Sequence, residues 1–258
     1  MNKVEIGFFS FTEVTDPKEH RAYNEWHQLD HLPEQIPLPG VVHGQRWVST
    51  PACREARVAA EPPLDRIHYL TLYLMSGPEA PVVERFRNWG EQLSELGRFH
   101  RHRVSHLSGP FLFLKAYAAP RVLISPEAIP YRPCRGLHVT VAEPIGRPDA
   151  PPDPLLEDYA QWLDRVRLPD LLEVPGVAGV WTFVGRSTRF HDAPDGRRIT
   201  VAYLDDDPLA VAERLAEKGR TWARQGRAHD WSRAIRIAYS GPFKTITPWE
   251  WDWFDDAS

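Results

Sequence analysis

The alternation of apolar and polar residues divides the first 117 residues into four strands and two helices. Apolar runs predict strands over residues 3–12, 41–49, 66–75 and 105–117. Asp16 and Pro17 supply a cap and a first-position proline for a helix that should end at Leu32, because Pro33 disfavours helical geometry in the residue before it. Residues 79–98 have the spacing of a second helix. The order β-α-β-β-α-β is that of a ferredoxin-like unit.

The same order recurs in the second half of the chain. Strands are predicted over 136–144, 177–185 and 199–204 and near the C-terminus, with helices opening at Pro154 and Pro208 and a turn at 192–198. Seven of nineteen positions are identical between 23–41 and 159–177. Two shorter matches fall in the same order: VVERF with VAERL, followed by Gly90 and Gly219, and the two copies of SGPF. The chain therefore contains an internal repeat.

A four-stranded sheet of this kind exposes an apolar face, and two copies can bury those faces against each other. We therefore predict an α+β fold in which two fused ferredoxin-like βαββαβ units pack as an intramolecular dimeric α/β barrel. The predicted organisation is a first unit over 1–117 that holds the active pocket, a linker over 118–135, a second, degenerate unit over 136–247 and a Trp-rich tail over 248–258.

Composition narrows the class of protein. The 258 residues are 42% hydrophobic and 26% charged, which is typical of a soluble globular protein. A net charge of −4 gives no reason to expect nucleic acid or an anionic membrane as a partner, and no apolar run approaches the roughly 20 residues that span a bilayer. The start MNKVEIGFFSF lacks the features of a secretion signal, and two cysteines make no disulfide framework. We expect a cytoplasmic protein.

Comparison of the two copies indicates which face of the first helix is buried. In the second copy, Tyr159, Trp162, Leu163 and Val166 have the spacing of a core-facing stripe. The equivalent positions 136 residues earlier are Tyr23, Trp26, His27 and Asp30, so a histidine and an aspartate replace two apolar residues. His31 lies one turn after His27 at the edge of the same face. We predict a cluster of His27, Asp30 and His31 as the catalytic group.

A structural interpretation of the same residues stays open. Asp30 would then pair with one histidine to satisfy a buried polar patch. Tyr23 and Trp26 recur in the second copy, which favours packing, although both could also contact a substrate. His43, Trp47 and His68 are further candidates for substrate binding, because neighbouring strands could turn them towards the helix.

Other histidines and the tail are less specific. His100, His102 and His106 share one face of a regular strand, which suits an anion or metal site or a solvated strand edge. The i,i+4 spacing of His27 and His31 can hold a metal, but no full ligand signature accompanies it, and we expect none. In the tail, Trp249, Trp251 and Trp253 alternate with acidic residues, so an extended segment would place them on one side. That side could dock on the barrel, cover a pocket or cover a dimer interface.

The motif Trp26-x4-His31-Leu32-Pro33-Glu34, followed by Pro39-Gly40-Val41, resembles that of the EthD-like branch of the dimeric α/β-barrel superfamily. The resemblance covers most of both halves. It implies a pocket between helices and sheet in each unit that handles a small hydrophobic or aromatic compound. Members of the superfamily include polyketide cyclases, quinone-forming monooxygenases, muconolactone isomerases and haem-binding enzymes. The second copy has Arg167 at the position of His31, so the resemblance implies chemistry in the first unit alone.

These observations predict an enzyme that uses no organic cofactor and acts on an aromatic, polyketide-like or other apolar small molecule. His27 or His31 would move a proton, with Asp30 orienting the ring, in an isomerisation, cyclisation or elimination (lyase) step. Oxygenation of a phenol by a cofactor-independent monooxygenase is the neighbouring alternative. Haem binding through a histidine, or ligand binding without catalysis, are the other two hypotheses. A homodimer of the fused pair stays open.

Overall fold

The computed structural model describes residues 4–146, 153–185 and 196–255. The first unit contains β1 (Val4–Val14), α1 (His20–Trp26), a π-helical turn (His27–His31), α2 (Leu32–Gln35), β2 (Val41–Val48), β4 (Tyr69–Ser76), α4 (Glu79–Glu95) and β5 (Arg103–Ala118). The second contains β6 (Gly136–Pro144), α5 (Pro154–Trp162), a π-helical turn (Leu163–Arg167), α6 (Leu168–Leu172), β7 (Val177–Val184), β8 (Arg198–Leu204), α7 (Pro208–Arg224) and β9 (Ile235–Thr245). The predicted order of elements is present in both units. The first four residues of the predicted turn at 192–198 lie outside the described residues.

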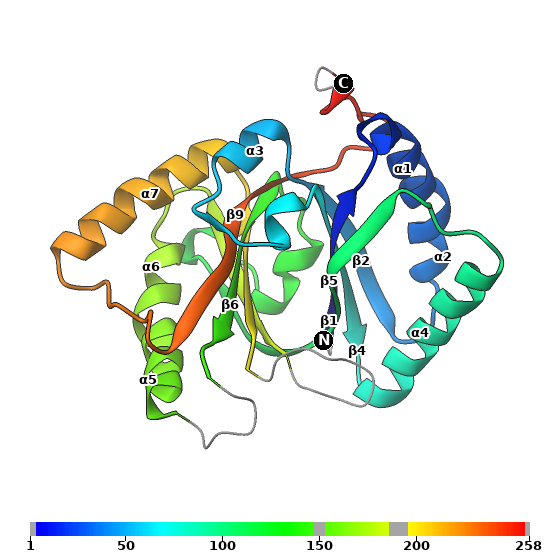
Figure 1. Cartoon of the computed structure of the whole chain (residues 1–258). Helices are drawn as coiled ribbons and strands as arrows, with labels where there is room; N and C mark the ends of the chain where they lie inside the picture. The colour runs from blue at the N-terminus through cyan, green and yellow to red at the C-terminus, as the bar shows by residue number, and fades with distance from the viewer. Residues whose placement is uncertain (1–3, 147–152, 186–195, 256–258) are drawn as a thin grey trace.

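The strands form one closed antiparallel barrel in the order β2-β4-β1-β5-β7-β8-β6-β9, with β9 returning to β2. The two units meet where β5 pairs with β7 and where β2 pairs with β9, at Trp47 and Thr245. The helices of the two units cover opposite outer sides of this barrel (Figure 1). The fused dimeric α/β-barrel fold predicted from the repeat is confirmed.

The barrel interior is packed with aromatic side chains from both units. These rings include Phe9, Phe11, Trp47, Phe111, Trp181, Phe183, Tyr239 and Phe243, each of them at most 1% exposed. Separate apolar clusters lie between each half-sheet and its own helices. The space between helix and sheet is therefore where a unit can keep a cavity.

The helix of the first unit does not end at Leu32 as predicted. The chain continues through Pro33 to Gln35, because the turn before the proline widens into a π-helix in which the Leu32 N–H donates to the His27 carbonyl. A wider turn removes the clash between a proline ring and the preceding carbonyls. The second unit repeats this turn before Pro169.

The predicted loop between β2 and β4 contains structure of its own. It forms α3 (Pro51–Glu55) and the short strand β3 (Ala59–Ala60), which pairs with β9 of the second unit. Figure 1 shows α3 beside β9 and near α7. A segment of the first unit thus forms part of the wall of the second.

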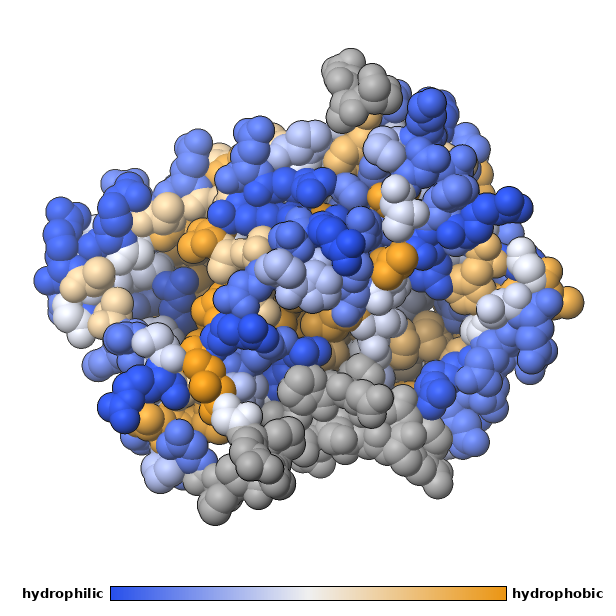
Figure 2. Space-filling model, viewed as in Figure 1, coloured by the Kyte–Doolittle hydropathy of each residue, from blue (hydrophilic) through white to orange (hydrophobic). Residues whose placement is uncertain are grey.

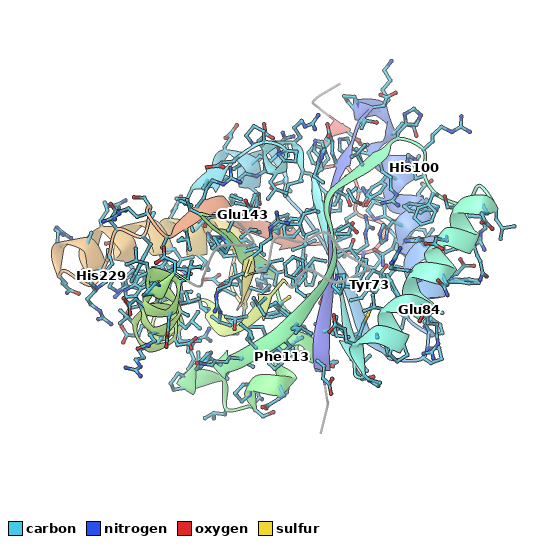
Figure 3. The ribbon with its side chains drawn as sticks, turned by 60° about the horizontal axis from the view of Figure 1, so that its bottom comes forward. Tyr73, Glu84, His100, Phe113, Glu143 and His229 are labelled. Atoms are coloured by element: carbon cyan, nitrogen blue, oxygen red, sulfur yellow. The ribbon has the colours of Figure 1, made fainter. Side chains whose placement is uncertain are left out.

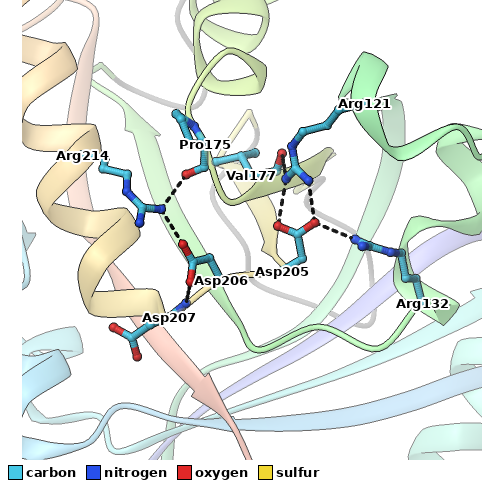
Figure 4. Close-up of polar contacts among 8 residues, drawn as sticks. All are labelled: Arg121, Arg132, Pro175, Val177, Asp205, Asp206, Asp207 and Arg214. Atoms are coloured by element: carbon cyan, nitrogen blue, oxygen red, sulfur yellow. Dashed lines mark hydrogen bonds and ion pairs between the residues drawn. The ribbon is translucent and has the colours of Figure 1, made fainter.

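The linker is held against the second unit rather than hanging free. Arg121 and Arg132 both donate to the Asp205 carboxylate, and the Trp181 indole donates to the Pro126 carbonyl at 2.9 Å. Figure 4 shows this arginine pair beside the contact of Arg214 with Asp206. The hydrogen bond from Arg121 holds the pKa of Asp205 below its ordinary value.

The tail returns to the first unit and packs near α1 (Figure 1). Phe254 stacks on His20 with ring centroids 4.0 Å apart, and Trp251 is buried in the same cluster. Trp249 is 69% exposed and has a positive φ of 73°, so the chain turns there and the three indoles do not share one face. The predicted extended alternation is wrong in this respect, although docking on the barrel is what the structure shows.

Candidate functional site

The first unit encloses a cavity of about 150 Å³ between its sheet and the π-helical turn, α2 and α4. It is lined by Phe8, Ser10, His27, His31, Gln35, Thr71, Tyr73, Phe86, Arg87, Gly90, Phe99, Arg103 and Ser108. A surface groove of about 480 Å³ adjoins it and shares Arg87, Gly90, Phe99, Arg103 and Ser108. A small reactive group can therefore occupy the inner chamber while the rest of a molecule lies in the groove.

His27 and His31 both line the chamber, with ring centroids 5.1 Å apart. His31 stacks on Trp26, and His27 approaches the Thr71 hydroxyl through Nε2 at 3.4 Å. Burial is the main cause that lowers the pKa of both rings, to about 3 for His31, and the nearby guanidinium groups lower it further. Both rings are therefore neutral at pH 7 and each has a nitrogen that can accept a proton.

Arg103 supplies a cation to the same chamber from the first residue of β5. Its guanidinium lies over the Phe99 ring, 4.5 Å from the centroid, and donates to Ser105 Oγ at 3.0 Å. Among the described residues it forms no ion pair with a carboxylate. Burial lowers the pKa of Arg103, which shows that the charge is incompletely solvated. An oxygen anion in the chamber would compensate this charge.

Three chamber residues keep a buried polar atom without a partner among the described residues. These atoms are His27 Nδ1, Gln35 Oε1 and the Tyr73 hydroxyl. Burial raises the pKa of Tyr73, so its hydroxyl stays protonated and can donate. Buried polar groups are nearly always hydrogen-bonded, so such a group of atoms around one cavity indicates a site made for a polar molecule.

Asp30 lies outside the chamber that His27 and His31 line, so the structure does not bring the three residues of the predicted cluster together. Its carboxylate pairs with Arg98 at 2.5 Å, and Arg98 also pairs with Glu34. The π-helical turn is the reason, because an added residue in the turn brings His31 rather than Asp30 onto the face of His27. No carboxylate orients either imidazole among the described residues.

The strand and helix candidates for substrate binding separate into two groups. Tyr23 and Trp26 pack behind the histidines, and the Trp26 indole donates to the Arg98 carbonyl at 2.7 Å. Neither of them lines the chamber. Trp47 faces the barrel interior, and His43, on the same face of β2, contacts Tyr131. The prediction that β2 turns these two side chains towards the helix is wrong, because strand register places them on the opposite face of the sheet.

His68 also lies outside the chamber. It precedes β4 at the end of the barrel, where Nδ1 accepts from the Val14 N–H at 3.1 Å and Nε2 lies 2.9 Å from Arg54. His106 and His100 pair with Glu13 and Glu19, at 2.6 Å and 3.3 Å. These histidines are held by partners of their own. Within the described ranges, no group of three or more His, Cys, Asp or Glu side chains is placed to hold a metal ion.

Sequence reasoning missed the groups that complete the chamber: Gln35, Thr71, Tyr73 and Arg103. The signal for Thr71 and Arg103 lies in the strand register. Ser10 is opposite both Thr71 and Ser108, and Arg103 is opposite Val14 on the same pair of strands. Without the register, an arginine in RFHRHRVSH is indistinguishable from a solvated residue.

The second unit holds a larger cavity, of about 660 Å³, between its sheet and α5, α6 and α7. Its wall is largely apolar and aromatic and includes Tyr159, Trp162, Leu163, Trp222 and Trp231, with His138, Arg167 and His229 among the polar residues. Figure 2 shows apolar residues gathered between the helices on the left and the central strands. In Figure 3, His229 and Tyr73 lie on opposite sides of the barrel, each in the unit whose cavity it lines. The expectation of a pocket function in the first unit alone does not follow from the shape of the molecule.

No protein-family model matches the chain, and no curated protein matches it. No helix in the described part of the chain is long and apolar enough to cross a membrane.

Several solved structures are similar to the chain over nearly its whole length. DyPB from Rhodococcus jostii RHA1 matches with a TM-score of 0.55 at 10% identity, covering 96% of this chain and 94% of that one. A dye-decolorizing peroxidase from Bacteroides thetaiotaomicron matches with a TM-score of 0.52 at 9% identity, covering 99% and 96%. A protein provisionally named a monooxygenase, from Fusobacterium nucleatum, matches with a TM-score of 0.51 at 8% identity, covering 96% and 94%. At this identity the likeness is one of fold, and it shows the dimeric α/β-barrel fold of two fused ferredoxin-like units.

Proposed function

We propose that the first unit is an enzyme that removes a proton from a small aromatic or apolar substrate beside its carbonyl or phenol oxygen. The observation that carries the proposal is the chamber itself, where two neutral histidines and an arginine without a carboxylate partner surround unpartnered polar atoms. The EthD-like motif and the enzymes among the similar structures support the same class. The motif residue His31 is part of this chamber.

In the proposed step, a C–H bond next to a carbonyl, or a phenol O–H bond, breaks and its proton goes to a ring nitrogen of His31 or His27. The electron pair stays on the substrate as an enolate or phenolate, whose charge rests on oxygen. Arg103 donates to that oxygen, and the Tyr73 hydroxyl is a second donor in the same chamber. Isomerisation, cyclisation, elimination and oxygenation of a phenol all begin from such an anion.

The low pKa of the histidines has a consequence for the chemistry. A ring whose pKa is about 3 is a weak base, so proton transfer requires that the product anion be stabilised strongly. A guanidinium in a small chamber that excludes water supplies this stabilisation, because electrostatic interactions are stronger there than in water. Substrates with a stabilised anion, such as aryl ketones and phenols, suit the site best.

The proposal can be tested with 1-indanone in D₂O, by measuring deuterium uptake next to the carbonyl by NMR. His31→Ala and His27→Leu should each slow enzyme-dependent exchange by roughly 10²–10⁴-fold, the usual contribution of a general base. Leucine is the residue that the second unit carries at the position of His27, so this variant should fold. His43→Gln is the matched control and should keep full exchange. Exchange no faster than in buffer, or full exchange in both variants, would contradict the proposal.

Haem binding is the second candidate, and the residues limit where it can occur. A variant of DyPB matches with a TM-score of 0.54 in complex with haem. The chamber of the first unit, at about 150 Å³, has no room for a porphyrin. The cavity of the second unit has the room, and His138, whose ring forms no hydrogen bond with the described residues, would be the iron ligand. Haem would supply redox chemistry there.

A Soret band that appears on adding haem and is lost in His138→Gln would support the haem candidate. A third outcome, a ligand that binds the first chamber and is recovered unchanged with no proton exchange, would favour a binding protein without catalysis.

A further inference from the structure

The two cavities are built from equivalent positions, which strand register identifies. Ser108 and Ser240 belong to the two SGPF segments, and they pair with Ser10 and Thr140. The next strand places Thr71 opposite Ser10 and Thr200 opposite Thr140. All six of these residues line the cavity of their own unit. The lining residues of the two cavities can therefore be compared position by position.

The second cavity lacks two aromatic rings that fill space in the first. Tyr73 is opposite Phe8 on the first sheet, and the equivalent pair on the second sheet is Ala202 and His138. Phe99 follows Arg98, whose counterpart Arg227 is followed by Ala228. The two alanines therefore leave open space in the second cavity that Tyr73 and Phe99 fill in the first, and they contribute to the difference between about 150 Å³ and about 660 Å³. The second cavity has the volume of a typical small-molecule site, roughly 300–1,000 Å³.

The second cavity also contains Arg167, a cation whose guanidinium forms no direct ion pair with a carboxylate of the described residues. Arg167, at the position of His31, lies over the Trp222 ring with its guanidinium carbon 5.0 Å from the centroid. Its guanidinium forms no ion pair or hydrogen bond with the described residues, because the carboxylate of Asp170, which lines the same cavity, is held by Arg227. Burial lowers the pKa of Arg167, so the charge is poorly solvated. A guanidinium placed this way is stabilised when an anion enters the cavity.

A neutral histidine faces the same space from the sheet. His138 is on β6, where the first unit has Phe8, and burial followed by the charge of Arg167 lowers its pKa to about 4. Its ring can therefore donate from one nitrogen and accept at the other at pH 7. The first unit has histidines on the helix and arginine on a strand, and the second unit has arginine on the helix and histidine on a strand. The second unit has thus exchanged its polar groups rather than lost them.

We propose that the cavity of the second unit is a binding site for a multi-ring aromatic carboxylate, too large for the first chamber, whose carboxylate binds Arg167 and His138. Tyr159, Trp162 and Trp222 supply the aromatic wall along which its rings lie. Planar bidentate recognition of a carboxylate is what a guanidinium does best. This inference is independent of the proton transfer proposed for the first unit, since it rests on different residues.

The test uses two fluorescent probes that differ in charge, anthracene-9-carboxylate and anthracene-9-methanol, titrated into the full chain. The wild type should bind the carboxylate saturably and more tightly than the alcohol. Arg167→Gln should weaken the carboxylate by about tenfold or more, the usual effect of losing a charged hydrogen bond, and change the alcohol little. His138→Gln should weaken the carboxylate to a smaller extent.

Two kinds of variant locate the site. Ala202→Tyr and Ala228→Phe each restore the first unit's residue and should abolish binding of both probes, while Arg103→Gln should leave both unchanged. Failure of saturable binding, equal affinity for the two probes, loss of binding in Arg103→Gln, or displacement of the carboxylate by haem would overturn the inference. A folded Ala228→Phe variant keeps the test decisive if Ala202→Tyr does not fold.

Discussion

Gly90, in the middle of α4, should be stabilised by substitution with alanine while the site it lines is impaired. A methyl group built at this position meets no atom within 4 Å, and the residue lines both the inner chamber and the outer groove. Alanine favours a helix interior over glycine by about 0.8–1.0 kcal/mol. With no steric cost, Gly90→Ala should raise the free energy of unfolding by about that amount, and the melting temperature by about 2–4 °C for a chain of this size.

Gly219 on α7 is the equivalent residue, also with open space around it, and Gly219→Ala should give the same stabilisation. Gly97 provides the matched control, since its methyl would meet no atom either but its φ is +67°. There alanine is forced into the left-handed region, so Gly97→Ala should lower stability by about 1 kcal/mol.

Thermal unfolding followed by circular dichroism measures all three variants. Gly90→Ala should also slow the deuterium exchange of 1-indanone, because the added methyl occupies part of the chamber. A destabilised Gly90→Ala variant, or a stabilised Gly97→Ala variant, would refute the reasoning that the glycines of α4 and α7 leave space in the two cavities at a cost in stability.

Three further predictions concern His138, the C-terminal tail and Asp30. Because the pKa of His138 is about 4 in the folded chain and 6.5 in the unfolded chain, only the unfolded chain takes up this proton between those values, and stability falls as pH drops from 6.5 to 4. His138→Gln should reduce the slope of the free energy of unfolding against pH, measured by urea unfolding, by up to about 1.4 kcal/mol per pH unit. An unchanged slope would contradict the prediction. Phe254→Ala should lower the free energy of unfolding by about 2–3 kcal/mol, because it removes a buried ring stacked on His20. Trp249→Ala, at an exposed position, should change it by less than about 0.5 kcal/mol. Equal effects of the two substitutions would disprove the docking of the tail. Asp30→Asn should keep deuterium exchange within about twofold, and a hundredfold loss would restore the carboxylate to the catalytic group.

The repeat made the fold predictable, because seven shared positions of nineteen and the two SGPF segments report the same element order twice. The side of the helix on which Asp30 lies was not predictable from the repeat. A period of 3.6 residues places it beside His27, but the widened turn before Pro33 shifts the register by one residue. The comparison with Val166 carried the same error, since both copies contain the turn.

Side chains on strands were harder to place than those on helices. Adjacent residues of a strand point to opposite faces, so an uncertainty of one residue reverses the assignment, as it did for His43 and Trp47. Arg103 sits in a run of charged residues and looks solvated until its partner strand is known. Part of the space in the second cavity comes from Ala202 and Ala228, and small residues carry no signal until they are compared with their aromatic counterparts.

The most direct test of the central claim is a spectrophotometric titration of bound 4-nitrophenol, whose phenol and phenolate forms absorb at different wavelengths. Measured in an Arg167→Gln background, which removes the unpaired guanidinium of the second cavity, the bound probe should ionise in the chamber of the first unit at a lower pH than it does free in solution. This shift should vanish in Arg103→Gln and shrink in His31→Ala. A bound probe that ionises at the solution pH, or a shift that persists without Arg103, would contradict the claim that this chamber stabilises an oxygen anion beside neutral histidines.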